Sequence, residues 1–269
     1  MSLLSRKISR GERKELMKTV KIKDMEIGTG MPKICIPITG RNREEILLDI
    51  EEIQRQKPDL AEWRADCYEE GEKEEKVLEM LETITDKLGQ IPLLFTFRTA
   101  AEGGSKDISF ENYVKLLCRV ADTGRIDLAD VEIFFGQEAS GKLIVRLQEK
   151  GVRVVASNHH FEGTPSKEEM LEILEKMYNS NSDILKIAVM PKSFEDLLVL
   201  LDTTKEASGK YDRPLITMSM GEIGFLSRIC GEFTGSALTF AAGRNASAPG
   251  QAAAANMRAI LSNIHEILS

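Results

Sequence analysis

Short apolar runs and longer amphipathic stretches alternate along almost the whole chain. Eight of the runs have the length and the β-branched content of strands, and the stretch after each run has apolar residues at helical spacing. Asn42 and Ser193 stand where the helices after the first and sixth runs would need an N-cap. The eight runs cover residues 33–39, 60–65, 92–98, 126–133, 152–157, 184–189, 214–218 and 234–240.

This strict alternation predicts the fold class. Strands that are separated by helices pair in parallel, and eight units without a linker between them predict closure into an α/β fold, the (β/α)8 TIM barrel. The length of 269 residues is close to the roughly 250 residues of such barrels. An open doubly wound sheet is the alternative, but the first strand–helix turn lacks the GxGxxG pattern of a dinucleotide site.

We therefore expect a single β/α-barrel domain over residues 1–269. Residues 1–30 form an N-terminal extension ahead of the first predicted barrel strand. Within it, residues 20–27 alternate between apolar and charged types and end at Gly28-Thr29-Gly30. This pattern predicts a short N-terminal β-hairpin.

Charge and composition narrow the classes of function. The net charge of −7 argues against a nucleic-acid partner or an anionic membrane surface. Residues 1–21 carry charges throughout and lack the apolar segment of a signal peptide, and no run reaches the roughly 18 apolar residues of a membrane span. We therefore expect a cytoplasmic protein without a membrane partner. Four scattered cysteines and three histidines favour neither a zinc site nor structural disulfides.

Lys186 stands in the middle of the sixth predicted strand, which is otherwise apolar. Burial disfavours the charged form of a lysine and lowers its pKa. A neutral amine near pH 7 is a nucleophile that forms Schiff bases with carbonyl compounds. The alternative is a lysine at a strand end whose amine reaches water.

Other polar residues stand late in the predicted strands or just after them, and in a β/α barrel these strand ends form the rim where active sites lie. Glu62 and Arg64 share one face of their strand, either as part of a site or as a structural ion pair. His159 and His160 are adjacent and point in different directions, so at most one of them faces the rim. The remaining candidates are Arg98, Glu102, Arg228, and Ser247 and Gln251 in a loop of small residues (243–251) that is typical of a lid.

The segments that carry these residues resemble type I 3-dehydroquinate dehydratase, the Schiff-base dehydroquinase of the shikimate pathway. Their order and spacing match the family from the second predicted strand to the last loop, which is most of the chain. The resemblance implies a β/α barrel, no cofactor, no metal and, usually, a homodimer. The matching segments are EWRAD (62–66), TFRTAAEGG (96–104), SNHHF (157–161), LKIAVMP (185–191), MGEIGFLSRICG (220–231), GSALTF (235–240) and SAPGQ (247–251).

The resemblance also implies a reaction, the syn-elimination of water from 3-dehydroquinate to give 3-dehydroshikimate, catalysed by a carbon–oxygen hydro-lyase. Lys186 falls on the family's imine-forming lysine, and His159 on its proton-transferring histidine. Glu102 matches the acid that orients this histidine. His160 stands where the family often has an acidic residue, so it is the alternative base. The substrate-binding set would be Glu62, Arg64, Arg98, Ser247, Gln251 and Arg228, with Arg228 on the substrate carboxylate.

Two other functions compete with this one. A different Schiff-base lyase, such as a class I aldolase, needs the same lysine but in most cases a phosphate site, and no clear glycine-rich phosphate loop follows the last two strands. A barrel that binds a small carboxylate without catalysis would keep Arg228. It would not need Lys186, His159 and Glu102 together.

Overall fold

The structure is a computed structural model that describes residues 19–136 and 138–269. Eight parallel strands form one sheet in the order β10-β3-β4-β5-β6-β7-β8-β9. A bridge between Leu215 and Ser236 joins the two edge strands, so the sheet closes into a barrel. The strands are β3 (Lys33–Ile38), β4 (Leu60–Arg64), β5 (Leu93–Thr96), β6 (Leu128–Glu132), β7 (Arg153–His160), β8 (Ile184–Val189), β9 (Leu215–Ser219) and β10 (Leu238–Phe240).

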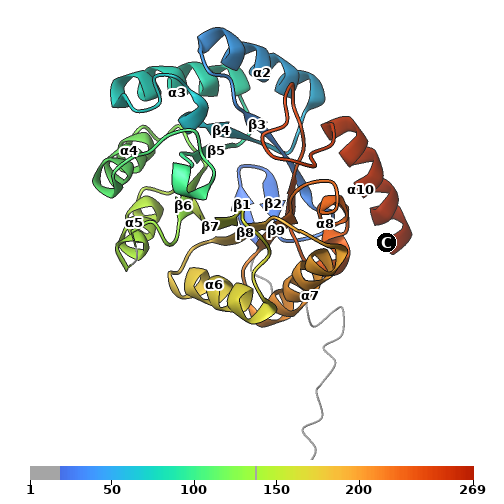
Figure 1. Cartoon of the computed structure of the whole chain (residues 1–269). Coiled ribbons are helices and arrows are strands. Elements are labelled where there is room, and N and C mark those ends of the chain that lie inside the picture. The colour runs from blue at the N-terminus through green and yellow to red at the C-terminus, as the bar shows by residue number, and fades with distance from the viewer. Residues whose placement is uncertain (1–18, 137) are drawn as a thin grey trace, which may run out of the picture.

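Helices surround the barrel on the outside, as Figure 1 shows. Ser166 and Ser193 start α6 and α7 with complete capping boxes, and Asn42 caps α2 by accepting a hydrogen bond from the amide of Glu45. The caps expected at Asn42 and Ser193 are therefore confirmed. The helices are α2 (Arg43–Gln56), α3 (Glu74–Leu88), α4 (Phe110–Asp122), α5 (Glu138–Glu149), α6 (Lys167–Asn179), α7 (Phe194–Lys210), α8 (Phe225–Ile229), α9 (Gly231–Thr234) and α10 (Ala254–Leu268).

The predicted N-terminal hairpin is present and closes one end of the barrel. Strands β1 (Val20–Ile22) and β2 (Met25–Ile27) pair antiparallel. Their buried side chains pack with residues that open the barrel strands, such as Leu60, Leu128 and Ile184. This apolar layer fills the N-terminal end of the barrel and leaves the C-terminal end for polar groups. The part of the predicted extension before Thr19 lies outside the described residues.

Three aspartates tie neighbouring strands together at the same N-terminal end. Each stands directly before a barrel strand and accepts a hydrogen bond from a main-chain amide at the start of the preceding strand. The donor and acceptor lie 2.8–2.9 Å apart in all three cases. Because a buried amide without a partner is costly, these carboxylates stabilise the closed barrel. The pairs are Ile34 with Asp59, Leu93 with Asp127, and Val154 with Asp183.

Most strand boundaries differ from the prediction by one or two residues, and two strands differ by three or more at one end. The eighth strand is shorter, because residues 231–234 form the small helix α9, which ends at Gly235 with a φ of 108°. The fifth strand is longer and reaches His160, since it pairs with β8 as far as Val189. Among the described residues, none of the helices has the length and apolar character that crossing a bilayer requires.

Candidate active site

A cavity of about 100 Å³ lies at the C-terminal end of the barrel and collects the predicted site residues. The strand ends and the loops after them supply its walls, as expected for this fold. The last loop reaches over it with Ala248 and Pro249. All the candidates except Arg228 and His160 line this cavity: Glu62, Arg64, Arg98, Glu102, His159, Lys186, Ser247 and Gln251.

Lys186 points into the barrel and is only 4% exposed. Its Nζ lies 3.3 Å from Oδ2 of Asp130 and 4.9 Å from the centre of the Phe240 ring. The alternative of an amine that reaches water is therefore wrong. Lys186 thus lies at ion-pair distance from a buried carboxylate inside the barrel, and the expectation of an uncharged amine stays a prediction.

Arg98 connects the buried charges beneath the cavity. Its Nη2 lies 2.9 Å from Asp130 and its Nη1 2.9 Å from Glu132, and Nη1 also donates to Oγ of Ser157 at 3.0 Å. Burial alone would lower the pKa of Arg98, but Asp130, Glu132 and Glu102 raise it well above its ordinary value. The same guanidinium, together with Lys186, keeps the pKa of Asp130 low although burial acts to raise it. This cluster holds the side chains of Lys186 and Arg98 against the same carboxylate, that of Asp130.

His159 and Glu102 form a hydrogen-bonded pair. Nδ1 of His159 lies 2.8 Å from Oε2 of Glu102. Burial and then the positive charges of Arg98 and Lys186 hold the pKa of His159 well below its ordinary value. Burial, with the nearby carboxylates of Glu132 and Asp130, raises the pKa of Glu102 to about 8 against the influence of Arg98. Groups in such close contact titrate as a pair, and this pair can hold or release one proton near neutral pH.

His160 points away from the cavity, as the alternation along a strand requires. It lines a separate surface hollow between β7 and α6, together with Glu162 and Glu169. Its Nε2 is buried without a hydrogen-bond partner among the described residues. The geometry therefore favours His159 over His160 as the residue that meets a ligand in the barrel.

Glu62 and Arg64 both face the cavity but do not pair with each other. Arg64 donates from Nε and Nη2 to the two carboxylate oxygens of Asp66, each at 2.8 Å, and Glu62 accepts from Oγ1 of Thr96 at 2.9 Å. The alternative of a structural Glu62–Arg64 ion pair is therefore wrong. Asp66 also accepts from the main-chain amides of Arg98 and Ser105, so it joins Arg64 to the loop that follows β5.

That loop bends back sharply and carries Glu102 to the cavity. Gly103 has a φ of 79°, and a Cβ there would lie 2.2 Å from the ring of Phe161. A Cβ on Gly104 would lie 1.9 Å from the carbonyl oxygen of Arg98. Glycine is required at both positions, because the loop packs its backbone directly against its neighbours.

Arg228 lies just behind the cavity wall and is 2% exposed. Its Nη2 donates to the carbonyl of Pro249 at 3.0 Å, and its Nη1 lies 4.0 Å from Sδ of Met218; both of these neighbours line the cavity. No ion pair of Arg228 with another described residue is found, its Nε has no partner among them, and burial lowers its pKa to about 10. A buried cation without a counter-ion is unfavourable, so this site favours an anionic ligand.

Hydrogen bonds within the loop of residues 243–251, and one from Gly221 outside it, hold this loop in place. Ser247 and Gln251 exchange two hydrogen bonds of 2.9 Å, from the amide of Ser247 to Oε1 of Gln251 and from Nε2 of Gln251 to Oγ of Ser247. The amide of Gly221 donates to the carbonyl of Pro249. The loop thus covers the mouth of the barrel beside Arg228.

Sequence reasoning missed four residues of this site. Asp130 and Glu132 stand two apart inside the apolar strand β6, in the way that Lys186 stands in β8, and the same signal could have identified them. Asp66 and Asn158 belong to the quoted segments but make contacts with residues more than 30 positions away. Nothing in the local pattern predicts such contacts.

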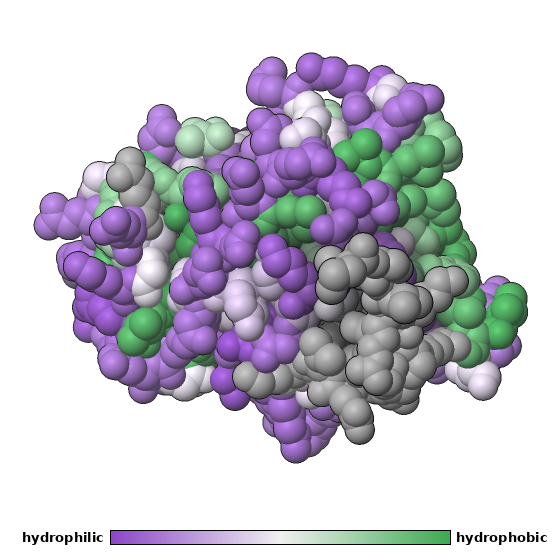
Figure 2. Space-filling model, turned by 90° about the horizontal axis from the view of Figure 1, so that it is seen from below, coloured by the Kyte–Doolittle hydropathy of each residue, from purple (hydrophilic) through white to green (hydrophobic). Residues whose placement is uncertain are grey.

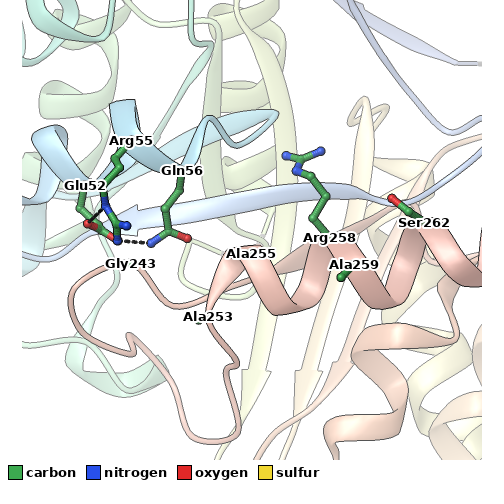
Figure 3. Close-up of a pocket in the computed structure, with 9 residues that line it drawn as sticks. All are labelled: Glu52, Arg55, Gln56, Gly243, Ala253, Ala255, Arg258, Ala259 and Ser262. Carbon is green, nitrogen blue, oxygen red and sulfur yellow. Dashed lines mark hydrogen bonds and ion pairs between the residues drawn. The ribbon is translucent and has the colours of Figure 1, made fainter.

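A larger hollow between α2 and α10 does not have the chemistry of an active site (Figure 3). Figure 3 shows Glu52, Arg55 and Gln56 gathered at one end and Arg258 at the other. Arg55 is paired with Glu52, and Arg258 donates to the carbonyl of Lys57. Alanine, glycine and Ser262 make up the remaining lining, and no histidine, lysine or cysteine is among the described residues that line the hollow.

Comparison with known proteins agrees with this geometry. The family model for "Type I 3-dehydroquinase" matches residues 34–268. The chain is 48% identical to a 3-dehydroquinate dehydratase of Bacillus velezensis, over 93% of this chain and 99% of the relative. It is 42% identical to a 3-dehydroquinate dehydratase of Clostridioides difficile, over 94% of this chain and all of the relative.

Solved structures give the same result. A crystal structure of type I 3-dehydroquinate dehydratase from Clostridium difficile, covalently modified with comenic acid, superposes with a TM-score of 0.90 at 42% identity. It covers 94% of this chain and 99% of its own. The 3-dehydroquinate dehydratase of Geobacillus kaustophilus superposes with a TM-score of 0.89 at 39% identity, over 93% of this chain and 97% of its own. The chain therefore belongs to the type I 3-dehydroquinase family.

Proposed function

We propose that the protein is a 3-dehydroquinate dehydratase that eliminates water from 3-dehydroquinate through a Schiff base on Lys186. One observation carries the proposal: a buried lysine, a histidine–carboxylate pair and a buried arginine without a counter-ion converge on one small cavity. Family membership supports the same activity, that of a hydro-lyase of the shikimate pathway.

In the first step, the deprotonated Nζ of Lys186 attacks the ketone carbon, and the resulting carbinolamine loses water to give a protonated imine. The cationic nitrogen draws electrons from the neighbouring carbon and makes its C–H acidic. Asp130 keeps its ion pair with Arg98 at 2.9 Å, so the carboxylate is not left unpaired when Lys186 becomes the imine. The proposed reaction needs neither a cofactor nor a metal, because the imine accepts the electrons.

In the second step, the free Nε2 of His159 takes the proton from that carbon, and an enamine forms. The imidazolium then protonates the leaving hydroxyl on the same face as water departs, which makes the elimination syn. Hydrolysis of the imine releases 3-dehydroshikimate and restores the amine. Glu102 supports both proton transfers, because its contact with Nδ1 orients the ring.

The remaining residues hold the substrate. The planar fork of Arg228 suits a carboxylate, and we propose that the substrate carboxylate takes the position of the Pro249 carbonyl on Nη2. Ser247 and Gln251 lie beside it in the same loop. Glu62, Arg64 and Arg98 face the hydroxyl groups of the ring. The homodimer and the cytoplasmic location stay predictions.

A product assay with matched lysine variants tests the proposal. We expect the wild type to convert 3-dehydroquinate, Lys186→Ala to lose at least about a thousandfold in kcat because it has no nucleophile, and Lys192→Ala to retain full activity. Lys192 follows the same strand but is exposed and does not line the cavity. Absence of conversion by the wild type, or full activity in Lys186→Ala, contradicts the proposal.

A further inference from the structure

Asn158 stands directly before His159 on β7 and, unlike His159, does not line the cavity. It is 7% exposed, and its Nδ2 donates to Oε1 of Glu102 at 3.0 Å. The other oxygen of the same carboxylate, Oε2, meets Nδ1 of His159 at 2.8 Å. Two successive residues of one strand therefore hold the two oxygens of one carboxylate.

Within the described part of the chain, the side chain of Asn158 satisfies only one of its two polar atoms. Its Oδ1 is buried and has no hydrogen-bond partner among the described residues. A buried polar atom without a partner destabilises a fold, and a leucine of similar volume would avoid that cost. What the amide contributes in return is its single hydrogen bond to Glu102.

The charges around Glu102 show what that hydrogen bond opposes. Nη1 of Arg98, which follows β5, lies 3.7 Å from Oε2, the oxygen that His159 also uses. Asp130 and Glu132 on β6 repel the carboxylate, and Lys186 on β8 faces the histidine. A carboxylate held only on Oε2 would be free to rotate toward the guanidinium and away from the ring.

We propose that Asn158 is a positioning residue, which fixes the Glu102 carboxylate by its Oε1 so that Oε2 stays on Nδ1 of His159. The proposal rests on the proposed function and deepens it, because it adds a residue that acts on the catalytic base through another side chain. The hydrogen bond also favours the charged form of Glu102. Removing it therefore makes the Glu102–His159 pair hold its proton more tightly.

The test compares Asn158→Leu with the wild type and with Thr204→Val. The control loses a buried hydrogen bond of 2.8 Å to Thr217, between α7 and β9, and Thr204 does not line the cavity. For Asn158→Leu we expect kcat to fall roughly ten- to a hundredfold, the range for a lost hydrogen bond to a charged group, with KM unchanged. The limb on which kcat rises with pH moves to higher pH. The variant still unfolds in one cooperative urea transition, and borohydride with substrate still labels Lys186.

Thr204→Val should also lose a buried hydrogen bond but keep the pH profile of the wild type. If Asn158→Leu has the pH profile of the wild type, the proposal is overturned, whether or not kcat falls. Asn158→Asp provides a second variant of the same shape, in which a carboxylate faces Glu102. Its rising limb must also move to higher pH, and an unmoved limb overturns the proposal. Loss of wild-type turnover or labelling would instead contradict the proposed function itself.

Discussion

At Lys186 the cavity holds the amine that the proposed reaction needs, beside a carboxylate that it shares with Arg98. Asp130 lies 3.3 Å from Nζ, but the same carboxylate oxygen also lies 2.9 Å from Nη2 of Arg98. Because one carboxylate contacts both Lys186 and Arg98, Asp130 keeps a partner when Lys186 forms the proposed imine. The contact thus positions the amine for the proposed attack.

The two adjacent histidines should differ in their contribution to kcat. We expect His159→Ala to lower kcat by roughly a hundred- to ten-thousandfold, the usual contribution of a general acid–base group, while His160→Ala stays close to the wild type. His159 contacts Glu102 and lines the cavity, whereas His160 lines the outer hollow. Steady-state turnover of 3-dehydroquinate measures both variants. Unchanged turnover in His159→Ala with a loss in His160→Ala would reverse the assignment.

Strand β6 carries two site residues, Asp130 and Glu132, that the sequence analysis did not identify. The apolar periodicity predicted a strand over residues 126–133, and the structure places β6 within this range at Leu128–Glu132. Its two acidic side chains are fully buried, because Arg98, Thr99, Ser157 and Lys186 from neighbouring elements bind them. These partners come from three separate parts of the chain, so local spacing does not predict the cluster.

The three aspartates that join neighbouring strands at the N-terminal end of the barrel lead to a prediction about stability. Asp183→Ala leaves the amide of Val154 without its acceptor at 2.9 Å, so we expect the free energy of unfolding to fall by about 1–3 kcal/mol. Asp24→Ala, an exposed change in the hairpin turn, should leave it unchanged. Urea denaturation measures both, and kcat should not change in either variant. Equal stability of the two variants would contradict the role of the aspartate.

At the scale of the whole molecule, the barrel was predictable because each strand–helix unit carries its own periodicity, and caps such as Asn42 and Ser193 mark where helices begin. The shared cavity followed from it, since all parallel strands end on one rim. Several features needed the structure, among them the shortened last strand, which depends on α9, the charge cluster on β6, and the bond between Asn158 and Glu102, which spans 56 positions. Contacts of that separation are set by how the loops pack, and no pattern within a short window encodes them.

The central claim is that the substrate becomes covalently attached to one lysine inside the closed barrel. Borohydride reduction in the presence of 3-dehydroquinate, followed by mass spectrometry of the digested protein, tests it most directly. We predict a single adduct on the peptide that contains Lys186, absent without substrate. An active enzyme that shows no adduct, or an adduct on an exposed lysine such as Lys192 with Lys186 unmodified, would contradict the account.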